Sequence, residues 1–75
     1  MHTLTIKHGL SSARREYQYS PTVQDIKNDS SLRAELGYGD NIRVLINGAE
    51  QPNHITIPAG VSLVTVETAA NQKAN

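Results

Sequence analysis

The sequence predicts an α+β domain in two layers, in which a mixed sheet of four or five strands packs on one helix. Three observations support this fold class. Residues 2–8 alternate polar and apolar side chains, as in a strand with one buried face. Apolar residues recur at helical spacing between residues 23 and 36. Residues 42–46 have strand character and are apolar on both faces from Val44 to Ile46, which indicates a covered strand. One amphipathic helix buries its apolar stripe most simply on such a sheet.

The first twenty residues are predicted to form an antiparallel hairpin. Residues 2–8 supply the first strand, and Gly9-Leu10-Ser11-Ser12 has the composition of a turn. Period-two alternation then continues over residues 15–20, which predicts the second strand there. Two strands joined by a short Gly/Ser turn are most simply antiparallel neighbours.

The helix has clear start and stop signals and an irregular middle. Thr22 is a suitable N-cap, and Asp25 three residues later favours the helix N-terminus. The pattern falters at residues 28–31, which are poor helix formers but good caps. We therefore expect either one helix with a break there or two short helices. Gly37 is a natural C-cap.

The second half of the chain is predicted to complete the sheet. We expect the last strand to lie between the first and third strands, parallel to the first. Residues 1–68 then form one domain, followed by a flexible tail at 69–75. The expected elements are a loop at 37–41, a strand at 42–46, a tight turn at Asn47-Gly48, a polar connection at 50–53, a short strand at 55–57, a turn at 58–60 and a last strand at 61–68.

Four short motifs mark the ends of the helix and of two strands. They are Thr22-Val23-Gln24-Asp25-Ile26, Leu36-Gly37, Val44-Leu45-Ile46-Asn47-Gly48 and Ile57-Pro58-Ala59-Gly60. In order and spacing they resemble the ubiquitin superfamily, and within it the small sulfur carriers of thiamin and molybdopterin synthesis. The resemblance spans residues 2–68 and implies a ubiquitin-like β-grasp fold. It says little about function, because one fold serves many functions.

The C-terminal sequence departs from that family. The resemblance implies a terminal Gly-Gly whose carboxylate is activated and then thiolated or conjugated. This chain ends in residues 72–75, Gln-Lys-Ala-Asn, and its last glycine is Gly60. We therefore keep a ubiquitin-like modifier or sulfur carrier with an atypical tail as the alternative function.

The charge balance argues against a dedicated nucleic-acid binder. Lysine and arginine number seven, aspartate and glutamate number seven, and the formal net charge is zero. Nucleic-acid binding usually requires a basic excess, because phosphate neutralisation supplies most of the affinity. A weak nucleic-acid interaction is the third function considered, through Arg14, Arg15, Lys7 and His8.

Neither a metal site nor a catalytic site is evident. The chain has no cysteine, which excludes disulfides and thiolate ligands. His2 and His8 share a strand face but lie on the order of 20 Å apart at strand rise, and His54 falls in a polar loop. We expect all three to be solvent-exposed or at strand ends. No serine stands beside a base and no carboxylates pair, so we expect no enzyme activity, no cofactor and no small-molecule substrate.

The N-terminal residues alternate in polarity and contain no continuous apolar stretch. We therefore expect no signal peptide, no transmembrane span, a cytoplasmic location and no membrane partner.

The second predicted strand carries the candidate binding residues, Arg15, Tyr17 and Tyr19. If the tyrosines face outward, they and the guanidinium line an exposed edge, and such residues are enriched in protein-binding hot spots. If the tyrosines are buried on the helix, Gln18, Glu16 and Arg14 face solvent and the edge is polar. Both arrangements stay open. A second possibility is a self-associating sheet face, since the strands carry more apolar residues than one helix covers.

The leading hypothesis is a non-catalytic protein–protein interaction module, an adaptor or assembly component that binds another protein or itself. A component encoded by a phage or mobile element fits the same pattern.

Overall fold

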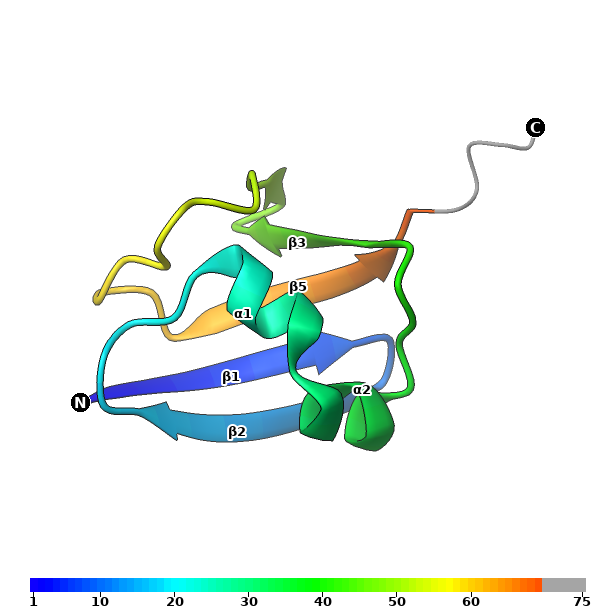
Figure 1. Cartoon of the computed structure of the whole chain (residues 1–75), viewed down its shortest axis with the longest axis horizontal. Coiled ribbons are helices and arrows are strands. Elements are labelled where there is room, and N and C mark those ends of the chain that lie inside the picture. The colour runs from blue at the N-terminus through cyan, green and yellow to red at the C-terminus, as the bar shows by residue number, and fades with distance from the viewer. Residues whose placement is uncertain (70–75) are drawn as a thin grey trace.

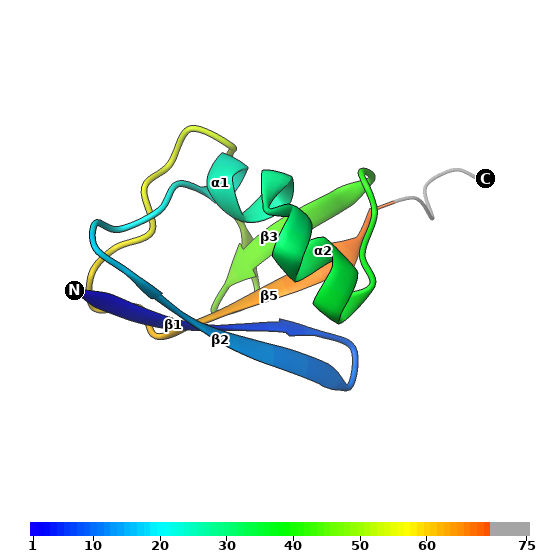
Figure 2. The same cartoon turned by 60° about the horizontal axis from the view of Figure 1, so that its bottom comes forward.

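The computed structural model describes residues 1–69, in which a mixed five-stranded sheet carries two short helices on one face (Figures 1 and 2). The strand order is β2-β1-β5-β3-β4. Ala69, the first residue of the predicted tail, donates its N–H to the Asn41 carbonyl at 2.8 Å, and the rest of that tail lies outside the described residues. The elements are β1 (His2–His8), β2 (Ser11–Tyr17), α1 (Val23–Asn28), α2 (Ser30–Leu36), β3 (Ile42–Ile46), β4 (Ala49–Glu50) and β5 (Leu63–Thr68).

The centre of the sheet is a parallel pair formed by the first and last strands. Ile6 of β1 lies beside Val64 of β5, and β5 in turn pairs antiparallel with β3, Val66 beside Val44. This confirms the predicted position and direction of the last strand. All four side chains are buried under the helices, so the central strands supply the middle of the core.

The β1–β2 hairpin differs from its predicted boundaries. Its turn has only two residues, Gly9 and Leu10, and β2 spans Ser11–Tyr17 rather than residues 15–20. Gly9 has φ +62°, which a glycine at the first turn position adopts without strain. This tight turn pairs His8 with Ser11 directly, so pairing starts earlier than the Gly/Ser composition indicated and ends at Tyr17.

The helical segment consists of two helices that share one cap. Thr22 and Asp25 form a reciprocal capping box at the start of α1, as predicted, with bonds of 3.0 and 3.1 Å. Asp29 ends α1, and its carboxylate accepts the Leu32 N–H at 3.0 Å to begin α2. Gly37, with φ +80°, is the predicted C-cap. Of the two arrangements left open by the sequence, the structure has the two short helices.

The segment between β3 and β5 is less regular than expected. Asn47 and Gly48 both have positive φ and form a tight turn, which returns the chain as the short unpredicted strand β4. The predicted strand at 55–57 is absent, because Thr56 makes only one bridge, to Thr22. The last strand begins at Leu63 instead of residue 61.

Two polar side chains complete the core. His2 lies at the start of β1, which fits the expected strand-end position, but its side chain is only 6% exposed. Its ring bonds Ser20 Oγ at 2.9 Å and the Val61 carbonyl at 2.6 Å, so both ring nitrogens have a partner. Tyr38, predicted as a loop residue, donates its buried hydroxyl to the Ile26 carbonyl at 2.7 Å. The fully buried side chains around them are Leu4, Ile6, Val23, Ile26, Leu32, Val44, Ile57, Val64 and Val66.

We predict that Asp29→Ala lowers the free energy of unfolding by about 1 kcal/mol, the usual cost of losing an N-cap. Asp29→Asn keeps an oxygen acceptor for the Leu32 N–H and should stay within a few tenths of a kcal/mol of the original protein. Urea denaturation followed by far-UV circular dichroism measures both values. Equal destabilisation by the two variants would mean that the cap is not what Asp29 contributes.

Candidate protein-binding edge

The three predicted site residues do not share one environment. Residues of β2 alternate between the helix side, where Ala13 is buried, and the uncovered side of the sheet. Arg15 and Tyr17 fall on the helix side and are partly buried. Tyr19 follows the end of β2 and is 82% exposed. The question left open by the sequence therefore has a separate answer for each tyrosine, because the strand ends between them.

Arg15 connects β2 to α2. Its guanidinium donates to the Glu35 carboxylate at 2.7 Å, to Ser31 Oγ at 3.2 Å and to the carbonyl of Arg14 at 3.0 Å. The hydrogen bond to Glu35 raises the pKa of Arg15 above its already high value, so the residue stays charged. This side chain is therefore held in one geometry beside the outer edge of β2 and is not a free binding group.

Tyr17 packs against the core where β2 passes the helices. Its hydroxyl oxygen is buried and finds no hydrogen-bond partner among the described residues. Burial, reinforced by the Asp29 carboxylate, raises the pKa of Tyr17. Tyr17 therefore acts mainly as a packing residue, and Tyr19 is the tyrosine that a partner can reach.

The outer edge of β2 presents backbone groups that bond to no other strand within residues 1–69. The Thr5 N–H donates to the Ser62 carbonyl on the β5 side at 2.8 Å, so Thr5 and its neighbour Arg14 exchange no ladder bonds. The N–H and C=O of Arg14 must then point away from β1. By the alternation of an antiparallel ladder the same holds for Ser12 and Glu16. We call these three exposed residues the β2 edge.

The sequence analysis named Arg14 and Glu16 as solvent-facing edge residues only for the arrangement in which both tyrosines are buried, and Arg14 also as a weak nucleic-acid contact. In the structure both residues are exposed, although of the two tyrosines only Tyr17 is partly buried. The glycine at position 9 is the sequence signal that permits a two-residue turn, and the pairing register follows from that turn once the structure shows it.

The uncovered sheet face is mainly polar. Its two leucines differ: Leu63 is 46% exposed, whereas Leu45 is only 8% exposed. The surplus of apolar residues expected from the sequence therefore leaves little apolar area on this face, and the edge is the better candidate for binding.

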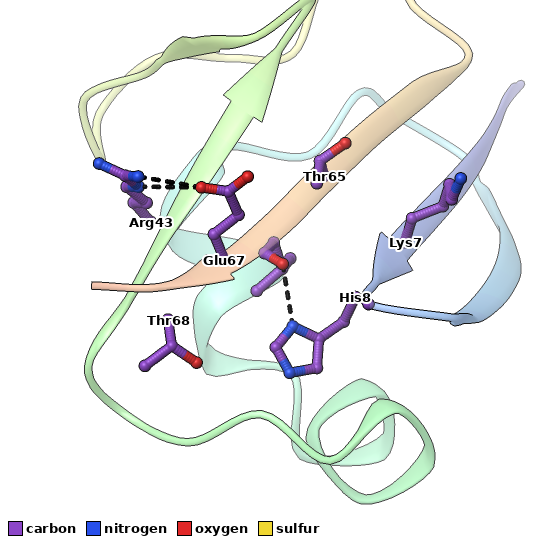
Figure 3. Close-up of a pocket in the computed structure, with 8 residues that line it drawn as sticks. Lys7, His8, Arg43, Thr65, Glu67 and Thr68 are labelled. Atoms are coloured by element: carbon purple, nitrogen blue, oxygen red, sulfur yellow. Dashed lines mark hydrogen bonds and ion pairs between the residues drawn. The ribbon is translucent and has the colours of Figure 1, made fainter. Parts of the chain in front are cut away.

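A shallow hollow of about 490 Å³ lies where β1 turns away from β5 (Figure 3). His8 donates Nδ1–H to the Val66 carbonyl at 2.9 Å, and its ring packs edge-on against Tyr38 with centroids 5.8 Å apart. Arg43 bonds the Glu67 carboxylate at 3.0 Å beside it. The hollow is open to solvent, and three of its side chains are already engaged: Arg43 with Glu67, and His8 with the Val66 carbonyl and Tyr38.

Within residues 1–69, no three histidine, aspartate or glutamate side chains gather as a metal site. No helix of that same region has the length and apolarity needed to cross a membrane. Comparison with protein-family models and with curated proteins found no match to this chain.

We predict that Tyr38→Phe lowers the free energy of unfolding by about 1 kcal/mol at neutral pH, because the Ile26 carbonyl loses its buried donor. Burial raises the pKa of Tyr38 to about 12 from its ordinary value of 10. A raised pKa means that the stability is complete below pH 10 and is lost as the pH climbs toward 12.

Urea denaturation at pH 8 and pH 11 tests this prediction. The original protein should lose more stability between the two pH values than Tyr38→Phe does. Tyr38→Phe should keep a smaller loss, because the pKa of Tyr17 is also raised. An alkaline loss of the same size in both proteins would contradict the assignment to Tyr38.

Proposed function

We propose that this chain is a non-catalytic protein–protein interaction module, an adaptor or assembly component built on a ubiquitin-like β-grasp domain. The β-grasp assignment is supported by the parallel central pair and by the helices crossing one sheet face. It agrees with the motifs at the helix and strand ends. A cytoplasmic location belongs to the same proposal.

The observation that carries the function is the difference between the two sheet edges. β4 ends the sheet on one side with only two residues, whereas β2 offers seven on the other. An exposed edge of this length can accept a strand from another chain through backbone hydrogen bonds. The exposed Tyr19 extends the same edge beyond the strand with an aromatic contact.

The side chains of the β2 edge favour a selective partner over indiscriminate pairing. Arg14 and Glu16 are exposed and opposite in charge, and charged residues on an edge disfavour apolar strands. A partner strand with charges of complementary order gains cross-strand pairs instead. A single-strand contact buries less than a standard interface, so we expect weak, reversible binding.

Site-specific photo-crosslinking tests this proposal. The benzophenone amino acid p-benzoylphenylalanine replaces Tyr19 beside the edge, and as a control it replaces the exposed Asn53 in the connection that follows β4. We expect protein adducts from position 19 and few from position 53, in an extract of the cells that encode the chain. Excess unlabelled protein should suppress the adducts.

Adducts of equal yield from both positions would contradict an interaction at the β2 edge. Adducts formed only with nucleic acid, and only at low salt, would instead support the nucleic-acid hypothesis. The affinity of a protein for nucleic acid falls steeply as the salt concentration rises.

A further inference from the structure

We propose that the β2 edge pairs with the β2 edge of a second copy of this chain, antiparallel about a two-fold axis, with Arg14 of each copy opposite Glu16 of the other. This inference rests on the proposed function and names its partner. It joins the two sheets edge to edge into one continuous sheet.

The backbone restricts the possible registers. Antiparallel strands exchange ladder bonds only between residues whose N–H and C=O both point toward the partner. On this edge those residues are Ser12, Arg14 and Glu16. A symmetric pairing centred near the middle of β2 therefore sets Arg14 opposite Arg14, Glu16 opposite Glu16, Ser12 opposite Arg14, or Arg14 opposite Glu16.

The charges select one of these registers. Like charges directly opposite one another destabilise a strand pair, and opposite charges stabilise it. Of these registers only Arg14 opposite Glu16 places opposite charges face to face on the edge, and the two-fold axis forms that ion pair twice. Both side chains are exposed on the same side of the sheet, so each pair can form without rearrangement of the domain.

The two-fold axis in this register passes beside Arg15. A free guanidinium there would repel its copy, but each Arg15 bonds Glu35 of its own α2 at 2.7 Å, which offsets the charge. The Arg14 carbonyl accepts one bond from Arg15 at 3.0 Å and has a second lone pair for a ladder bond. The Arg15 contacts are therefore compatible with the pairing.

Exposed apolar side chains at both ends of the strand support the same register. Leu10 in the hairpin turn is fully exposed, and Tyr19 beyond the strand is 82% exposed. With Arg14 opposite Glu16, Tyr17 at the end of β2 lies opposite Ala13 of the second copy, and Tyr19 two residues further is directed toward Ser11 and Leu10 of that copy. The two-fold symmetry creates this contact at both ends of the strand pair, so Leu10 of each copy is covered by Tyr19 of the other.

Sedimentation velocity over a concentration series tests the pairing. We expect weak dimerisation of the original protein, weakened about tenfold by Arg14→Glu or by Glu16→Arg, since each change places like charges opposite one another twice. An equimolar mixture of the two variants should restore the dimer, because every facing pair is then Glu against Arg. The matched controls are Lys27→Glu on α1 and Glu50→Arg on β4, which make the same charge changes on elements other than the two hairpin strands and should leave dimerisation unchanged.

Backbone amide NMR spectra provide a second readout that needs no variant. The amides of Ser12, Arg14 and Glu16 should shift with concentration, while those of β4 should not. A monomer at all concentrations, or a mixture that fails to dimerise, would overturn the pairing of two copies. In that case, adducts between position 19 and other proteins would still support the proposed function, and their absence would remove both proposals.

Discussion

The parallel pairing of β1 with β5 is the constraint on which the rest of the structure depends. Because β5 comes last and fills the place between β1 and β3, the chain leaving β2 must cross the sheet before β3 can form. It crosses as α1 and α2 over one face, as Figure 2 shows. One sheet face is therefore buried, the other meets solvent, and β2 and β4 become the two edges.

The same arrangement explains why the core includes polar groups. His2 stands at the start of a central strand, and its ring reaches Ser20 and the Val61 carbonyl, so one side chain connects three segments. Tyr38 similarly joins the loop after α2 to α1 through the Ile26 carbonyl. In a chain without Phe or Trp, these rings fill volume that aliphatic side chains leave at the ends of the sheet, and each has a partner for its polar atom.

The strand β2 has one face that is fixed to the helices and one face that is accessible to solvent. Arg15 and Tyr17 attach the strand to the helices, which fixes the direction of its outer backbone groups. Arg14 and Glu16 alternate with them and remain exposed. A strand held in this way can bind a partner without reordering itself, so little conformational entropy is lost on association.

Local patterns in the sequence determined the fold class, the capping box at Thr22, the C-cap at Gly37 and the order of the main strands, because periodicity and cap chemistry act within a few residues. Only the tertiary structure decided which residues of β2 face the helices and that the predicted strand at 55–57 makes a single bridge. It also decided that Tyr17 is partly buried while Tyr19 is exposed. These outcomes depend on the strand register and on contacts between distant segments, such as Arg15 with Glu35. The sequence after β1 is compatible with a hairpin turn of two or of four residues, so the local pattern alone cannot specify the pairing register of the hairpin.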